Sequence, residues 1–266
     1  MRPLSEFPRH EAARITTLFT DIDDTLTTDG RLPAAAYAAL ERLADSGIEV
    51  VPVTGRPAGW CDMIARFWPV AGVIGENGAF YFAFDRRARR MRRVHHATEA
   101  ERAAARAGLE RIRARVLAEV PGALVSADQP FRAHDLAIDF SEDVPPLEPA
   151  AVARIVAIFE EEGATARVSS IHVNGWFGSW DKLTMSRRFA AEVLGRDLDA
   201  ERERMLFCGD SPNDVPMFRF FPHACGVANL RDFAGRLEAE PSWIAAARGA
   251  AGFVEIAEHL LAARRG

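Results

Sequence analysis

Short apolar stretches alternate with segments of helical periodicity through the first eighty residues. Strands are predicted at Thr16–Thr20, at the β-branched run Ile48–Val53 and at Ala71–Ile74. Helices are predicted between them over 33–47, which ends at a glycine, and over about 57–67. This alternation predicts a parallel sheet with helices on its faces, in which ligands bind beyond the carboxyl ends of the strands.

The pattern changes in the middle of the chain and returns in the last third. The middle predicts the strands 79–84, 94–96, 136–140 and 164–173 and the helices 99–120 and 150–162. The last third predicts the strands 205–208 and 224–227 and the helices from 182, over 215–220 and over 253–263. The predicted fold class is therefore α/β, with a doubly wound parallel-sheet core of residues 1–82 and 179–266. A smaller α/β unit, residues 83–178, is inserted into it.

Composition is that of an ordinary soluble globular protein. The 266 residues are 48% hydrophobic and carry a formal net charge of -5. No apolar run approaches the ~20 residues that a membrane helix needs, and the polar N-terminus lacks the apolar core of a secretory signal. The three scattered cysteines favour buried free thiols over disulfides. These features predict a cytoplasmic protein without a membrane partner.

The positive charges are almost all arginines. Lys182 is the only lysine, whereas the other 32 of the 33 basic residues are arginines. An ammonium group is a compact point charge and guanidinium a broad planar fork, so a retained lysine suggests a site that needs the compact charge. The alternative is a stray lysine on the surface.

Acidic and polar residues follow several of the predicted strands. Asp21 and Asp23 come directly after the first strand, where residues two apart point to the same face. Such a pair needs a hard cation such as Mg²⁺ between the carboxylates, or one carboxyl that stays protonated as a general acid. Thr54-Gly55-Arg56 and Gly209-Asp210-Ser211-Pro212-Asn213-Asp214 follow later strands. The second of these could also be a helix N-cap, although capping accounts for only one or two of its polar residues.

In this order and context, the Asp21, Thr54, Lys182 and Asp210 segments resemble the haloacid dehalogenase superfamily of phosphohydrolases. The long middle insert, Glu76–Ala79 and Gly226–Asn229 resemble the subgroup with a large α/β cap. That subgroup includes Cof-type, sucrose-phosphate and mannosyl-phosphoglycerate phosphatases. The resemblance implies a Rossmann-like core, and a cap domain that selects the substrate.

The resemblance also implies roles for individual residues. Asp21 attacks phosphorus to form an aspartyl-phosphate, and Asp23 protonates the leaving oxygen. Mg²⁺ is held by the carboxylates of Asp21 and Asp210 and by the backbone carbonyl of Asp23, with Asp214 in its outer shell. The Thr54 hydroxyl and the Lys182 ammonium bind the phosphoryl oxygens, which is a role that suits the solitary lysine.

Substrate contacts are expected on both sides of the site. On the core side they are Thr54, Gly55, Arg56, Asn77 and Lys182, and on the cap side they are His172, Asn174 and Trp176. An aromatic ring with amide groups suits a sugar. The alternative is that Asn174-Gly175 forms a hairpin turn and that the tryptophans pack the hinge.

The basic run Arg86–Arg93 raises the question of nucleic-acid binding. It contains no aromatic residue, and the chain is acidic overall, so we interpret it as a solvated edge of the cap rather than a nucleic-acid site.

Three functions follow from these observations. The first is a Mg²⁺-dependent phosphatase for a small phosphorylated metabolite, in particular a sugar phosphate. The second is a phosphosugar mutase of the same architecture, and the third is a regulatory protein that binds a phosphorylated ligand without turnover. Clustered, mutually repelling carboxylates argue against the third. The sequence predicts a monomer or a homodimer and no nucleic-acid partner.

Overall fold

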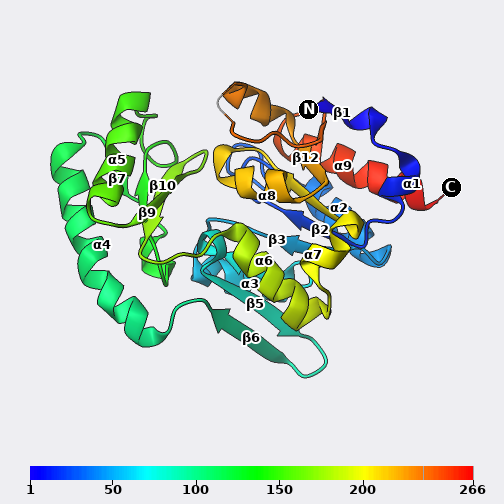
Figure 1. Cartoon of the computed structure of the whole chain (residues 1–266), viewed down its shortest axis with the longest axis horizontal. Helices are drawn as coiled ribbons and strands as arrows, with labels where there is room; N and C mark the ends of the chain where they lie inside the picture. The colour runs from blue at the N-terminus through cyan, green and yellow to red at the C-terminus, as the bar shows by residue number, and fades with distance from the viewer. Residues whose placement is uncertain (236, 266) are drawn as a thin grey trace.

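The computed structural model describes residues 1–235 and 237–265, which form two lobes (Figure 1). The larger lobe contains both ends of the chain and a parallel six-stranded sheet in the order β1-β13-β12-β11-β2-β3. Its strands are β1 (Arg2–Pro3), β2 (Thr17–Thr20), β3 (Glu49–Pro52), β11 (Met205–Gly209), β12 (His223–Gly226) and β13 (Trp243–Ile244). The predicted α/β class with a parallel-sheet core is thereby confirmed.

Alternating side chains of these strands pack against helices on opposite faces of the sheet. Leu18 and Leu206 join a core with α1 (Arg9–Ala12), α2 (Ala34–Asp45), α3 (Ala58–Phe67) and α9 (Gly249–Arg264). Phe19 and Phe207 join a second core with α6 (Lys182–Phe189), α7 (Leu198–Glu201) and α8 (Val215–Phe220). With apolar residues on both faces, the sheet is covered on each side, which leaves its strand ends as the place for polar groups. Within the described residues, none of the helices combines the length and apolar character of a membrane crossing.

A second, antiparallel sheet extends the larger lobe beyond β3. It consists of β4 (Val73–Gly75), β5 (Phe80–Asp85) and β6 (Arg90–His95). The basic run covers the tip and the outer strand of the β5–β6 hairpin, where Arg92 pairs with Glu192, and Arg93 with Asp62.

The boundary predicted at residue 83 falls inside β5. Tyr81, Ala83 and Val94 of the hairpin pack with Met185 and Phe189 of α6, in the core of the larger lobe. Because both strands of the hairpin share that core, we propose that the chain passes into the cap after His95, and that it returns near residue 180.

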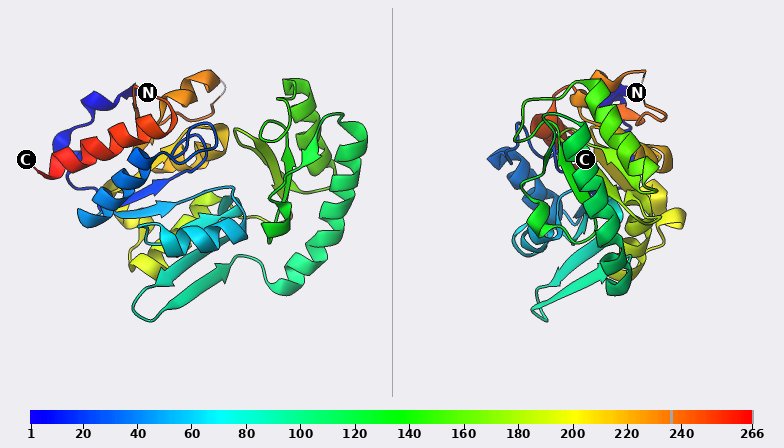
Figure 2. Two further views of the ribbon diagram at one scale, coloured as in Figure 1. Left: turned by 180° about the vertical axis from the view of Figure 1, so that it is seen from behind. Right: turned by 90° about the vertical axis from the view of Figure 1, so that its left-hand side faces the viewer.

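The smaller lobe is the cap, and it has its own antiparallel sheet in the order β7-β8-β10-β9. Its elements are α4 (Glu99–Glu119), β7 (Leu124–Val125), β8 (Leu136–Asp139), α5 (Pro149–Glu161), β9 (Thr165–Val168) and β10 (His172–Trp176). Both helices pack on one face of this sheet, around Ile112, Ile158 and Val173. Side chains alternate along a strand, so His172, Asn174 and Trp176 point to the other face of the sheet. Figure 2 shows that this sheet lies between the larger lobe and α4.

One expectation for the cap is wrong. Residues 164–173 do not form the expected single strand, and the alternative of a turn at Asn174-Gly175 does not hold either. They form a hairpin of β9 and β10 that turns at 169–171, and Asn174 and Gly175 lie within β10, paired with β8. A Cβ atom on Gly175 would lie 2.1 Å from the Phe159 ring, so this glycine admits the close approach of α5 instead of forming a turn.

Candidate active site

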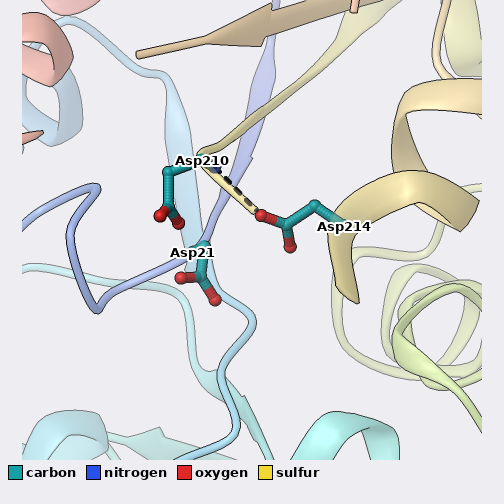
Figure 3. Close-up of side chains that lie close together, drawn as sticks. All are labelled: Asp21, Asp210 and Asp214. Atoms are coloured by element: carbon teal, nitrogen blue, oxygen red, sulfur yellow. Dashed lines mark hydrogen bonds between the residues drawn. The ribbon is translucent and has the colours of Figure 1, made fainter. Parts of the chain in front are cut away.

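Lys182 and three aspartates meet at the carboxyl end of the core sheet. The Lys182 Nζ atom lies 2.7 Å from Asp21 Oδ1 and 2.7 Å from Asp214 Oδ1. The carboxylates of Asp21, Asp210 and Asp214 converge, with one oxygen of each within 4.8 Å of the others (Figure 3). All four residues are buried. Segments more than 160 residues apart in sequence thus form one charged cluster.

The local sequence explains how two of these carboxylates are placed. The backbone N–H of Asp21 donates to the Cys208 carbonyl, which continues the pairing of β2 with β11 past the last strand residue. Asp210 follows β11 directly, and its carboxylate accepts a hydrogen bond from the Thr25 hydroxyl. Adjacent parallel strands therefore deliver both carboxylates to the same edge.

Asp214 closes the turn after β11. Its Oδ2 accepts the backbone N–H groups of Asp210 at 3.1 Å and of Ser211 at 3.4 Å. A Cβ on Gly209 would lie 2.2 Å from that oxygen, so only glycine admits this turn. With Oδ1 on Lys182, both Asp214 oxygens are already engaged.

The cluster holds three buried carboxylates but one ammonium group. Burial raises the pKa of Asp21 to about 8, against the lowering effect of Lys182. Burial, together with Asp21 and Asp214, raises the pKa of Asp210 well above its usual range. Burial by itself would lower the pKa of Lys182, but Asp21 and Asp214 outweigh it and raise that pKa. The ammonium group therefore stays charged, whereas ionisation of all three carboxylates would leave the cluster with an excess of negative charge.

These residues fit a hard divalent cation. Carboxylate oxygens are the ligands that such ions prefer, and a dication would offset the uncompensated charge of Asp21 and Asp210. Both carboxylate oxygens of Asp214 already accept hydrogen bonds, from Lys182 and from two backbone N–H groups. Asp21 and Asp210 therefore have the oxygens that are available as metal ligands. The acidic triad can thus hold a metal ion, mainly through these two.

Asp23 lies outside this cluster and pairs with Arg56. The guanidinium donates from Nε to Oδ1 of Asp23 at 2.9 Å and from Nη2 to the same oxygen at 2.8 Å. The Arg56 side chain is buried, although arginines are mostly exposed. Asp23 is therefore held in one orientation, beside Asp21, by a fork of charged hydrogen bonds.

Arg56 also binds the cap. Its Nη2 donates to Glu142 Oε1 at 2.6 Å, and its Nη1 lies 3.6 Å from Asp128 Oδ2. His172 Nε2 lies 2.9 Å from Glu142 Oε2. Burial acts to raise the pKa of Glu142, but its bonds with His172 and Arg56 outweigh burial and lower it to about 2. A continuous row of contacting polar side chains therefore runs from Asp23 of the core to His172 of the cap.

The other predicted core residues line the same strand ends. Thr54 is buried after β3, and its hydroxyl accepts the Arg56 backbone N–H at 3.0 Å. A Cβ on Gly55 would lie 3.3 Å from Asn77 Nδ2 and 3.6 Å from Asn174 Oδ1, so glycine keeps room between these amides. Asn77 is buried, and neither its side-chain oxygen nor its nitrogen has a hydrogen-bond partner among the described residues.

The predicted cap residues divide into two groups. His172 and Asn174 line the cavity over Asp21, together with the β9–β10 turn. Trp176 does not line it; its buried ring stacks on Trp180 with the ring centroids 5.9 Å apart. Trp176 therefore packs where the chain returns from the cap to the core.

The space over the acidic cluster is nearly closed. The cavity between Asp21, Asp23 and His172 has a volume of about 10 Å³. A neighbouring cavity of about 300 Å³, lined by Asp24, Glu142 and Ser170, lies beside Asp23. The two lobes thus meet over the carboxylates in a closed arrangement.

Sequence reasoning missed the acidic partners that the cap supplies to Arg56. Glu142 stands on a turn after β8, in which the Asp139 carboxylate accepts the N–H groups of Ser141, Glu142 and Asp143. The sequence feature that could have indicated this role is the position of Glu142, an acidic residue shortly after a predicted strand of the cap. Which strand ends face the core depends on how the lobes meet, which the cap sequence does not indicate.

Comparisons with known proteins agree with this architecture. The family model described as haloacid dehalogenase-like hydrolase matches residues 18–100. A phosphoglycolate phosphatase from Methanoculleus marisnigri is 28% identical over 241 residues, which cover 90% of this chain and 94% of the relative. The segment matched by the family model includes Asp21, Asp23 and Arg56.

Solved structures share the fold over nearly the whole chain. A Thermoplasma acidophilum protein superposes with a TM-score of 0.69 at 18% identity, covering 92% of this chain and 98% of that one. The sucrose-phosphatase of Synechocystis, solved with sucrose and phosphate, gives 0.60 at 16% identity, covering 92% and 97%. The segment that the family model matches contains Asp21 and Asp23. The fold shared with the solved structures extends over both the core and the cap. Residues 18–100 are therefore similar to the haloacid dehalogenase-like hydrolases, and the chain shares its fold of core and cap with these solved structures.

Proposed function

We propose that this protein is a Mg²⁺-dependent phosphatase that hydrolyses a small phosphorylated metabolite through an aspartyl-phosphate. The observation that carries the proposal is the contact of Lys182 with Asp21 and Asp214 beside Asp210. A fixed ammonium and a metal-binding carboxylate pair around one potential nucleophile are what phosphoryl transfer requires.

The reaction has two steps. A carboxylate oxygen of Asp21 attacks phosphorus, the bond from phosphorus to the ester oxygen breaks, and Asp23 gives its proton to the leaving oxygen. Asp23 then takes a proton from water, whose oxygen attacks phosphorus and releases phosphate and the free Asp21 carboxylate. Lys182 and the Thr54 hydroxyl bind the phosphoryl oxygens as negative charge develops on them.

Asp21 and Asp210, with the backbone carbonyl of Asp23, would hold Mg²⁺, and Asp214 would orient the site from outside. The bound ion supplies positive charge that screens the carboxylates from the phosphate group. Arg56 has a further part, because Asp23 can carry a proton only if Arg56 loosens its fork of hydrogen bonds. A substrate anion that attracts Arg56 would release Asp23 for proton transfer.

Two substrate classes are candidates. A sugar phosphate is the first, because amide and imidazole groups of the cap, on Asn174 and His172, line the cavity. A small phosphorylated carboxylic acid is the second, as for the relative named phosphoglycolate phosphatase. The second is favoured by the cationic Arg56 in the wall of this cavity, because a guanidinium group pairs with carboxylates.

A phosphate-release assay tests the proposal. The panel contains sugar phosphates and phosphoglycolate, each with and without Mg²⁺, and a bisphosphate primer is added in a parallel series to reveal a mutase. We expect Mg²⁺-dependent hydrolysis that Asp21→Asn abolishes with the fold intact, and that the exposed control Asp29→Asn retains. Turnover by Asp21→Asn would refute the nucleophile. The cytoplasmic location and the monomeric or homodimeric state stay predictions.

A further inference from the structure

Glu76 is a buried acidic residue that the proposed reaction does not use. It follows β4, and both it and Asn77 have left-handed backbone conformations, with φ of 44° and 54°. Such conformations are unfavourable in residues other than glycine, and they persist where the surroundings impose them. The Glu76 side chain is fully buried, so its contacts are the place to find what imposes them.

The Glu76 carboxylate joins core and cap. Oε1 accepts the N–H of Ala58 at the start of α3, at 3.0 Å, and that of Ala133 in the cap, at 2.8 Å. Oε2 accepts the N–H groups of His134 at 2.6 Å and Asp135 at 3.3 Å. Three consecutive amides of a cap loop thus converge on one acidic side chain of the core. Burial and the nearby Asp135 raise the pKa of Glu76 to about 8, against the lowering effect of Arg132 and of the Ala133 and His134 amides.

The same cap loop holds both walls of the cavity over Asp21. Arg132 donates from Nη1 to the carbonyl of Gly55 at 2.9 Å, next to Thr54 and Arg56. Asp135 Oδ2 accepts a hydrogen bond from Asn174 Nδ2 at 2.9 Å. The Arg132 and Asp135 side chains are themselves fully buried and paired with each other.

We propose that Glu76 is a positioning residue that fixes the cap loop 132–135 on the core. It thereby sets the orientation of Asn174 and of the 54–56 segment around the substrate. This carboxylate ties the lobes together, in addition to the two chain crossings and the contacts of Arg56 with Glu142 and Asp128. It acts through Arg132 and Asp135, and it touches neither Asp21 nor Lys182. Its effect on turnover rests on the proposed phosphatase function, whereas its effect on the loop does not.

Hydrogen exchange measured by mass spectrometry tests the tie directly. Glu76→Gln keeps the shape and one acceptor oxygen but turns an amide NH₂ toward the N–H groups. The matched control is Glu255→Gln, because the Glu255 carboxylate accepts the N–H groups of Ala246 and Ala247 within the core alone. We expect residues 133–135 to exchange at least about tenfold faster in Glu76→Gln and unchanged in the control, since the loss of a buried hydrogen bond is sufficient for such a factor.

Kinetics separate positioning from a merely structural role. For a substrate identified in the panel, we expect Glu76→Gln to raise KM about tenfold and to leave kcat within about twofold. A fall in kcat at constant KM, or exchange of 133–135 as slow as in the wild type, would overturn the proposal. If Glu76→Gln does not fold, hydrogen exchange of the wild-type protein provides the test. We then expect the amides of residues 133–135 to be protected as strongly as those of β8. Exchange of these amides at the rate of an open loop would refute the proposed tie. Absence of phosphatase activity would refute the proposed function and leave the exchange result valid.

Discussion

The Lys182 ammonium nitrogen lies 2.7 Å from Oδ1 of Asp21, across 161 positions of sequence, and it reaches Asp214 at the same distance. The lysine is the first residue of α6, and Asp21 follows β2, so the contact depends on how the chain returns from the cap. Because all three groups are buried, removing the ammonium leaves two carboxylates without their common partner.

Replacement of Lys182 should therefore impair turnover strongly. We expect Lys182→Met to lower kcat/KM by about 10²–10³-fold, because a fixed charge that meets the transferring phosphoryl group contributes on that scale. The control is Arg187→Met, which removes an exposed cation from the same helix. Steady-state phosphate release checks the prediction, and activity of Lys182→Met within tenfold of the wild type would contradict the role assigned to the ammonium.

The Asp210 carboxylate should lower the free energy of unfolding when no metal is bound and raise it when a metal ion is bound. Its pKa is raised well above the usual range by burial and by Asp21 and Asp214, so the ionised form is unfavourable in the fold. We expect Asp210→Asn to raise the unfolding free energy in EDTA by about 1–2 kcal/mol near pH 7.5. At a hundredfold excess over Kd, Mg²⁺ should stabilise the wild type by about 2.7 kcal/mol and the variant much less.

Thermal unfolding with and without Mg²⁺ checks both halves of this prediction. Asp45→Asn, at the exposed end of α2, serves as the control and should respond to Mg²⁺ like the wild type. An Asp210→Asn protein that Mg²⁺ stabilises as much as the wild type would show that this carboxylate is not a ligand.

Acid should weaken the junction of the lobes through His134. Its Nε2 lies 2.8 Å from His95 Nδ1, and burial, together with His95 and Arg102, lowers the pKa of His134 to about 3. An unfolded histidine titrates near 6.5, so between these values the unfolded chain binds more protons and stability falls as pH falls. At pH 5 this loss is about 2 kcal/mol relative to pH 7.5.

Urea unfolding at the two pH values measures that loss. His134→Gln should lose about 2 kcal/mol less than the wild type on acidification, because its side chain does not titrate. His10→Gln, at an exposed site, should behave like the wild type. Equal pH dependence in all three proteins would show that the pair does not remain neutral in the fold.

Gly175 should tolerate no side chain, for steric rather than conformational reasons. An added Cβ would lie 2.1 Å from the Phe159 ring, so Gly175→Ala forces α5 away from β10 and should cost about 1–3 kcal/mol of stability. The comparison is Gly163→Ala, where φ is 79° and nothing lies within 4 Å, so only the backbone is strained. Denaturant unfolding checks both. If Gly175→Ala is combined with the smaller Phe159→Leu, part of the loss should be recovered.

Much of the core could be predicted from the sequence. Apolar runs such as Ile48–Val53 are covered on both faces and alternate with helical segments, which is sufficient to predict a parallel sheet. Parallel strands bring their carboxyl ends to one edge, so the proximity of Asp21, Thr54 and Asp210 follows from local pattern and topology together. Composition singled out Lys182, because one lysine among 33 basic residues stands out without any structure.

Only the tertiary structure decided which partners the charged side chains took. Arg56 binds Asp23 and the cap residue Glu142, and Glu76 binds amides of a cap loop, because two separately folded lobes meet there. Such contacts join positions with no common periodicity, so no local pattern encodes them. The alternative of a turn at Asn174-Gly175 fails for the same reason. Pairing with β8 and the packing of Phe159 outweigh the local turn preference of two residues, and the chain turns at 169–171 instead.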